Sequence, residues 1–220
     1  EMLVALLLEQ AEKNGARVVR EKVTLEAVGE EVRVLLGGEV QAFDAVVLSS
    51  GAWVKELLEP LGYYVDVRPQ KGQLIELTLE TTEDTSKWPV CMLHGEIDIL
   101  PFPNGKILVG ATHENTQGFD LIPDEELLNG MYEEACASLP SLKNAKRSGV
   151  RVGTRAYTSD FLPFFGEVPN TTNAFVASGL GSSGLTSGVW IGECLARMAA
   201  GEEVGFSVEK YTPQNYVRKV

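Results

Sequence analysis

Two arginines on one predicted strand are the residues best suited to binding a ligand. The segment SGVRVGTRAY, residues 148–157, has the alternation that is typical of a strand. On such a strand two arginines and two glycines share one face: Gly149, Arg151, Gly153 and Arg155. The glycines leave open space, so an arginine there can clamp a ligand carboxylate with paired hydrogen bonds. The alternative is that both arginines form ion pairs with some of the 31 acidic side chains.

A glycine-rich turn, GLGSSG, is the second candidate site. Its GxGxxG spacing, Gly179, Gly181 and Gly184, follows an apolar strand pattern and precedes a helical pattern, as in a dinucleotide-binding turn. A Rossmann sheet needs further strands and helices, however, and the chain ends at Val220, in a polar tail. We therefore interpret the turn as a helix N-terminus whose N–H groups, over residues 181–185, favour negative charge on a ligand.

The helix predicted after this turn, over about residues 185–200, carries small residues on one stripe. They recur at intervals of four: Gly184, Gly188, Gly192, Ala196 and Ala200. A glycine inside a helix costs about 1 kcal/mol relative to alanine. The stripe indicates the close approach either of a flat ligand or of another backbone in tight helix-on-sheet packing.

Other chemistries find little support in the sequence. His94 and His113 have no catalytic or metal-binding spacing, and Ser182 lies in GSSG rather than in the GxSxG of serine hydrolases. The three cysteines are widely spaced and form no CxxC, which argues against a disulfide framework or a zinc site and fits a reducing cytoplasm. We predict no metal site and no catalytic acid, base or nucleophile.

The elements that position these residues change character along the chain. Residues 1–15 have the pattern of a helix, and ARVVR, KVTLEAV and EVRVLL that of short strands. The apolar run 45–48 predicts a strand buried on both faces in a parallel sheet. From about Val65 the strands alternate and the Asn104-Gly105 pair predicts a hairpin, which indicates an antiparallel sheet covered by a helix over 124–138.

We therefore predict a mixed α/β and α+β fold. An antiparallel domain, residues 67–149, would lie beside an incomplete α/β domain made of residues 1–66 and 150–220. The net charge of −12 and the pI of about 4.7 argue against nucleic acid or an anionic membrane as partner. The early apolar run, residues 3–8, is too short to span a bilayer.

Several of these stretches resemble the FAD-dependent D-amino acid oxidase, glycine oxidase and sarcosine oxidase family. RAYTSDFLPFFG is similar to the family's Arg-Pro-x-Thr-x-Asp pattern, and FVASGLGSSGLTSG to its closing flavin-contacting turn. VVLSSGAW, RPQKGQLIEL and PFPNGKILVGATHENTQGFD are similar to further family segments. The matches follow the family order and cover nearly all of the chain.

The resemblance implies an oxidoreductase in which FAD accepts a hydride from the α-carbon of a small amino acid or N-methyl amino acid. Arg155 matches the arginine that holds the substrate carboxylate, and Arg151 is a weaker candidate for substrate binding. The implied cofactor contacts are Val23, Gly51, Ala52, Gly181, Ser182, Ser183, Gly184 and Leu185.

The family's own GxGxxG lies in an N-terminal strand-turn-helix that these 220 residues do not contain. We therefore expect the C-terminal portion of a longer flavoenzyme, with the 67–149 domain binding substrate and the other binding part of FAD. Alone, the chain is expected to lack FAD, to be inactive and to self-associate through exposed apolar surface. The alternative is a non-catalytic carboxylate-binding module of the same family. Transfer of electrons to dioxygen or to another acceptor stays open.

Overall fold

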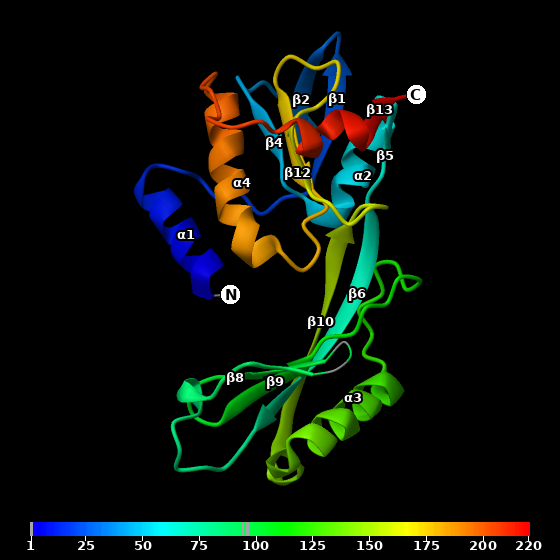
Figure 1. The fold of residues 1–220 in the computed structure, drawn as a ribbon. Helices are drawn as coiled ribbons and strands as arrows, with labels where there is room; N and C mark the ends of the chain where they lie inside the picture. Colours follow the sequence, from blue (N-terminus) through cyan, green and yellow to red (C-terminus); the bar gives the residue numbers. More distant parts are fainter. Residues whose placement is uncertain (1, 94, 96) are drawn as a thin grey trace.

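A pair of long strands connects two groups of elements in the computed structural model, which describes residues 2–93, 95 and 97–220 (Figure 1). The strands are β6 (Arg68–Thr78) and β10 (Lys146–Tyr157), and they pair antiparallel with Gly153 opposite Gly72. One group of elements lies at each end of this two-stranded ribbon, so residues near its middle are within reach of both groups.

At one end the ribbon belongs to a five-stranded antiparallel sheet in the order β10-β6-β9-β8-β7. The added strands are β7 (Cys91–Met92), β8 (Asp98–Pro101) and β9 (Lys106–Gly110). Between β8 and β9, Asn104 and Gly105 have φ angles of 62° and 71°, as the predicted hairpin turn requires.

Helix α3 (Glu125–Ser138) covers one face of this sheet. It begins after Asp124, whose carboxylate accepts hydrogen bonds from the N–H groups of Glu126 and Leu127. Its apolar residues form one core with the sheet, including Leu128, Met131 and Ala135 from the helix and Ile75, Leu77, Ile107 and Val109 from the strands. The predicted antiparallel sheet with its helix is therefore present.

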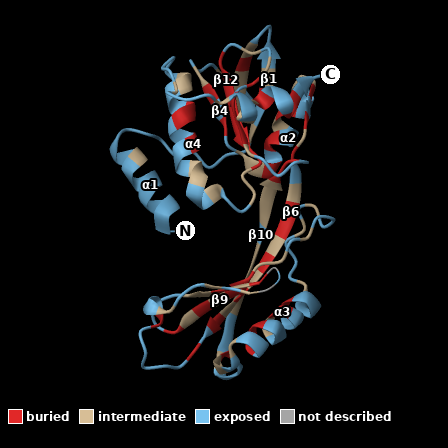
Figure 2. Ribbon diagram, in the orientation of Figure 1, coloured by how far each residue is buried: buried red, intermediate tan, exposed pale blue. Residues whose placement is uncertain are grey.

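At the other end, a smaller sheet has the order β11-β12-β4, with β12 and β4 parallel. Its strands are β4 (Val46–Leu48), β11 (Phe164–Glu167) and β12 (Ala174–Ser178), and helix α4 (Gly184–Ala199) packs against it. The first and last thirds of the chain thus meet in one α/β layer. Figure 2 shows buried residues in this layer and in the sheet that α3 covers.

The remaining elements surround this layer. They are α1 (Met2–Lys13), the antiparallel strands β1 (Val23–Val28), β2 (Glu31–Leu36) and β3 (Glu39–Gln41), the short helix α2 (Val54–Leu58), and the strand pair β5 (Tyr63–Val65) and β13 (Val217–Lys219). None of the described residues of α1 is buried.

Two expectations about local structure were wrong, and a third feature concerns the proposed domain boundary. ARVVR, residues 16–20, forms no strand, and Val18 and Val19 are each 49% exposed, because no other strand pairs with them in the described structure. Val47 in β4 is also exposed, so this strand is buried on one face only. Strand β10 continues to Tyr157, across the proposed domain boundary at residue 149. The predicted mixed α/β and α+β class is confirmed.

Candidate functional site

The guanidinium of Arg155 lies above a glycine on the neighbouring strand. A Cβ atom placed at Gly72 would be 2.3 Å from Nη1 of Arg155, so any larger residue there would push the arginine aside. Nη1 donates a hydrogen bond to the carbonyl oxygen of Thr112, at 2.9 Å. Arg155 is therefore positioned by two features. Gly72 on β6 has no side chain to obstruct the guanidinium, and the Thr112 carbonyl in the loop after β9 accepts its hydrogen bond.

Gln73 fixes that loop to β6. Its backbone N–H donates to Thr112 Oγ1 at 2.9 Å, and its carbonyl accepts from the N–H of Thr112 at 3.1 Å. The buried side chain of Gln73 donates to Glu114 Oε1 and accepts from the N–H of Asp124, each at 2.7 Å. The start of α3, the loop and the strand are thus held together, and the Thr112 carbonyl stays in place for Arg155.

A cavity of about 400 Å³, called here the glycine-walled cavity, opens between β10, β12 and α4. It is lined by Ser49, Gly51, Thr154, Arg155, Ala156, Ala177, Ser178, Leu180, Gly181, Gly188, Ile191, Gly192 and Leu195. A Cβ placed at Gly51 or Gly192 would meet nothing within 4 Å, and one at Gly188 only the Leu180 side chain, at 3.6 Å. The glycines of α4 therefore leave space and do not serve close packing of backbones.

The turn before α4 is tied to its surroundings. Gly179 has a φ of +74°, and a Cβ there would lie 2.8 Å from Thr158 Cγ2. Ser178 Oγ donates to the carbonyl of Gly51 at 2.8 Å, and the N–H of Gly181 donates to the carbonyl of Ala156 at 2.8 Å. The turn thereby connects β12, β10 and the 3-10 turn at Gly51–Trp53.

These contacts correct the expected set of free N–H groups at residues 181–185. The N–H of Gly181 is used by Ala156, and the N–H of Ser183 donates to the carbonyl of Leu180 at 2.9 Å. Both bonds arise because the turn closes on itself and on β10 before the helix begins. The positive end of the α4 dipole is still present at Gly184, the first residue of the helix.

A second cavity of about 250 Å³, called here the arginine cavity, lies on the ribbon itself. It is lined by Gly72, Leu74, Ala111, Arg151, Val152, Gly153, Thr154 and Arg155. Two residues, Thr154 and Arg155, line both this cavity and the glycine-walled cavity. Arg155 therefore stands between a small space bordered by guanidinium groups and a larger space with glycine and apolar walls.

Arg151 differs from Arg155 in its surroundings. Its Nε donates to Oε1 of Glu76, and Nζ of Lys106 lies 3.5 Å from Oε2 of the same carboxylate. The hydrogen bond from Arg151, with the nearby positive charges, holds the pKa of Glu76 below its usual range although partial burial opposes this. The ion-pair alternative considered for the two arginines thus holds for Arg151.

Asp160, in the RAYTSDFLP segment, lines neither cavity but stabilises a loop next to them. Asp160 Oδ1 accepts from Thr158 Oγ1 at 2.9 Å and from the N–H of Leu162 at 3.1 Å, and Oδ2 accepts from Tyr216 at 2.9 Å. Burial alone would raise the pKa of Asp160, but these hydrogen bonds lower it. Burial and the bond to Asp160 raise the pKa of Tyr216 to about 12. This network fixes the loop that contacts Gly179.

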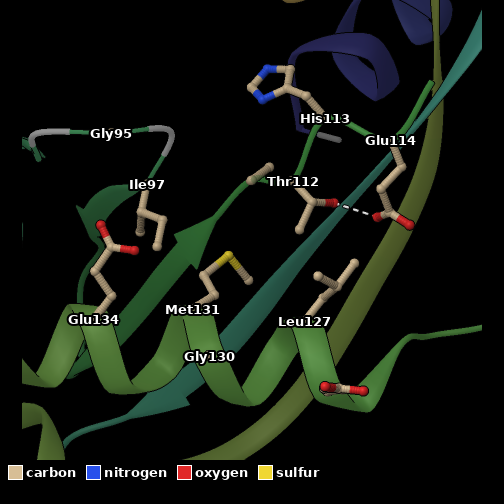
Figure 3. A pocket seen from close by; sticks show the side chains of 11 residues that line it. Gly95, Ile97, Thr112, His113, Glu114, Leu127, Gly130, Met131 and Glu134 are labelled. Atoms are coloured by element: carbon tan, nitrogen blue, oxygen red, sulfur yellow. Dashed lines mark hydrogen bonds between the residues drawn. The ribbon is translucent and has the colours of Figure 1, made fainter.

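A third cavity, of about 670 Å³, lies on the α3 side of the sheet (Figure 3). Its lining includes three carboxylates, Glu114, Glu126 and Glu134, beside the apolar Leu127 and Met131, and no arginine among the described residues. Such a lining repels carboxylates. Although this cavity is larger, the two cavities at Arg155 are better suited to an amino acid.

The predicted site residues divide into two sets. Arg151, Arg155, Gly51 and Gly181 line the two cavities at the ribbon. The others do not line them: Val23, Ala52, Ser182, Ser183, Gly184 and Leu185. Ala52 belongs to the apolar core around α2, Val23 begins β1, and Leu185 is 74% exposed. These residues stay predictions as cofactor contacts.

The sequence argument missed the residues that hold Arg155. Gly72 and Gln73 lie in the KGQ segment, which was noted only for its resemblance, and Thr112 and Thr154 were not singled out. The adjacent Gly-Gln pair in a strand was an available signal, because glycine weakens a strand unless something approaches its backbone closely.

In the described part of the chain, no group of three or more His, Cys, Asp or Glu side chains could hold a metal ion. No described helix is long and apolar enough to cross a membrane.

Comparison with known proteins places this geometry in a family. A family model for FAD dependent oxidoreductases (DAO) matches residues 1–198. The uncharacterized oxidoreductase YurR of Bacillus subtilis is 39% identical over 211 residues, which cover 94% of this chain and 56% of that protein. The glycine oxidase of Pseudomonas aeruginosa is 31% identical over 176 residues, or 80% of this chain and 47% of that protein.

Solved structures agree with these sequence matches. The iminodiacetate oxidase of a Chelativorans species superposes with a TM-score of 0.91 at 32% identity, covering 96% of this chain and 57% of that one. The glycine oxidase of Geobacillus kaustophilus, at 24% identity and a TM-score of 0.88, shares the fold. The chain spans about half the length of the curated relatives it matches. The resemblance noted in the sequence is thereby confirmed, and the chain belongs to the FAD-dependent oxidoreductase family.

Proposed function

We propose that the chain forms part of a flavoenzyme that oxidises the C–N bond of a small amino acid or N-methyl amino acid. The observation that carries this proposal is the place of Arg155, which borders both the arginine cavity and the glycine-walled cavity. A substrate whose carboxylate binds Arg155 would have its α-carbon close to whatever occupies the larger cavity. Relatives called glycine oxidase and iminodiacetate oxidase act on compounds of this kind by their names.

The glycine-walled cavity fits the ring system of FAD. Its apolar side chains, Leu180, Ile191 and Leu195, suit an aromatic ring, and the glycines of α4 leave room for one. The buried hydroxyl groups of Ser50 and Thr154, at or beside the cavity, have no hydrogen-bond partner among the described residues. When bound, FAD would supply the acceptor for the hydride that leaves the substrate's α-carbon.

The residues of this chain would bind and orient the two reactants. Gly51 and Gly181 would border the flavin, and Ser182, Ser183, Gly184 and Leu185 at the start of α4 would favour negative charge on it. Val23 and Ala52 are proposed as more distant contacts. Arg155 would hold the substrate carboxylate with its planar fork while Thr112 keeps the guanidinium oriented.

The two ends of the ribbon would then have separate roles. Residues 67–149 supply Gly72, Gln73 and Thr112, which position the substrate-binding arginine. Residues 1–66 and 150–220 supply all of the residues that line the glycine-walled cavity. We propose the first part as the substrate-binding domain and the second as a portion of the FAD-binding domain, with β10 continuous across the boundary.

Binding of a carboxylate by Arg155 can be tested directly on the chain. Titration with glycine or sarcosine, followed by NMR chemical shifts, should show saturable binding that Arg155→Leu weakens at least tenfold, because a buried carboxylate would lose its partner. Arg147→Leu is the matched control, since Arg147 lies on the same strand and pairs with Glu125 outside both cavities. Equal effects of the two changes would remove Arg155 from the proposed role.

The chain alone is not expected to retain FAD. A helix N-terminus contributes at most about 2 kcal/mol, whereas binding costs about 4 to 15 kcal/mol in lost freedom and ordering. The chain also spans only about half of its relatives. After incubation with excess FAD and gel filtration, the protein peak should carry little flavin absorbance. A stoichiometric flavin signal would show that these 220 residues suffice for cofactor binding.

A further inference from the structure

Two guanidinium groups border the same small cavity. Arg151 and Arg155 both line the arginine cavity of about 250 Å³, together with the apolar Leu74 and Ala111. They are four positions apart on the strand, so about 13 Å separates their Cα atoms. A single carboxylate needs only one of these guanidiniums, and the proposed function assigns it to Arg155.

The strand surface between the two arginines is uncovered at Gly153. Gly153 lies midway between them on β10, opposite Gly72 on β6, and a Cβ placed at Gly153 would meet nothing within 4 Å. The guanidinium of Arg155 extends toward Arg151, because it lies above Gly72, which is level with Gly153. A ligand can therefore lie over Gly153, with one end near the Arg155 guanidinium above Gly72 and the other near Arg151.

One partner of Arg151 is the carboxylate of Glu76, which also lies near a second cation. Glu76 accepts from Nε of Arg151 through Oε1, while Lys106 Nζ lies 3.5 Å from Oε2. The side chain of Arg151 is 40% exposed and that of Glu76 19%. If a ligand carboxylate replaced Glu76 at Arg151, Glu76 would still be paired with Lys106, so the exchange would leave no carboxylate unpaired.

From this geometry, and resting on the proposed function, we infer that the substrate is an amine carrying two carboxylates. Arg155 holds the carboxylate beside the reacting carbon, and Arg151 binds the distal carboxylate in exchange for Glu76. Arg151 is then a specificity-determining residue. A monocarboxylate such as sarcosine would fill the Arg155 end alone and leave the Arg151–Glu76 pair intact.

The inference is tested by comparing two probes, iminodiacetate and sarcosine, in calorimetric titrations of the chain. We expect iminodiacetate to bind at least tenfold more tightly than sarcosine. Arg151→Gln should reduce this ratio to near one by weakening iminodiacetate alone. Glu76→Gln should tighten iminodiacetate several-fold, because it removes the competing carboxylate, and should leave sarcosine unchanged. Arg151→Lys should restore part of the preference. Circular dichroism spectra identical to the parent's establish that each variant is folded.

The two proposals fail in different ways. Absence of binding by both probes, or binding of both that survives Arg155→Leu, overturns the proposed carboxylate site. Equal affinities for the two probes in the parent chain, or an affinity ratio that Arg151→Gln does not change, overturn the dicarboxylate inference while Arg155 keeps its role. Arg147→Gln is the control for a general effect of charge, and a loss of the ratio in that variant also counts against the inference.

Discussion

Helices α3 and α4 show two ways in which a helix can lie on a sheet. Helix α3 buries Leu128, Met131 and Ala135 against the large sheet, and the cavity of about 670 Å³ beside it is bordered by three carboxylates. Helix α4 buries Ile191 and Leu195 but turns Gly188 and Gly192 toward a cavity of about 400 Å³. The two helices therefore leave spaces of different chemistry, because carboxylates border the cavity beside α3, whereas glycines and apolar side chains border much of the cavity beside α4.

The largest effect should come from the apolar core under α3. Leu128 is fully buried, so Leu128→Ala should lower the free energy of unfolding by about 2 to 5 kcal/mol. Leu185, near the start of α4, is 74% exposed, and Leu185→Ala should change stability by less than about 0.5 kcal/mol. Urea denaturation of both variants measures the difference. Similar losses would contradict the exposed position of Leu185.

A smaller effect distinguishes the glycines of the two helices. Gly130 in α3 and Gly192 in α4 each have nothing within 4 Å of an added Cβ, so replacement by alanine should stabilise each helix by about 1 kcal/mol. Only Gly192→Ala places a methyl group at the glycine-walled cavity. A titration with FMN, followed by flavin fluorescence, should show weaker binding for Gly192→Ala and no change for Gly130→Ala. Equal FMN affinities would contradict a flavin site beside α4.

The smallest effect is a pH dependence at the α4 end of the molecule, where Tyr216 stacks on Phe164. Its pKa is raised from 10.0 to about 12, first by burial and then by Asp160. A raised pKa means that the folded protein holds the phenol proton more tightly, so this stabilisation is complete below pH 10 and is lost as the pH rises toward 12. Tyr216→Phe should flatten the decline of the melting temperature over that interval. An unchanged slope would assign the decline to other groups.

Local patterns predicted most of the elements, because their signals lie within a few residues. The Asn104-Gly105 hairpin and the helix predicted over residues 124–138 are examples in which side-chain chemistry determines backbone conformation nearby. The ARVVR segment failed for the opposite reason. A strand exists only through a partner, and residues 16–20 have none in the described structure.

The candidate site was predictable only in part. Alternation placed Arg151 and Arg155 on one face, but it could not distinguish the arginine that pairs with Glu76 from the one that reaches Thr112. Those partners lie 75 and 43 residues away, and strand pairing brings them together. The helix-terminus argument likewise could not foresee that β10 would take the N–H of Gly181.

The position of Arg155 between two cavities has a thermodynamic consequence. If Arg155 contacts a ligand in each cavity, the binding free energies of the two ligands depend on each other. Any shift of the guanidinium toward one ligand changes its hydrogen bonds and its electrostatic interaction with the other. Such coupling is reciprocal: the factor by which a bound carboxylate changes the affinity for a flavin must equal the factor by which the flavin changes the affinity for the carboxylate. The order in which the two reactants bind therefore cannot alter the stability of the complex that contains both.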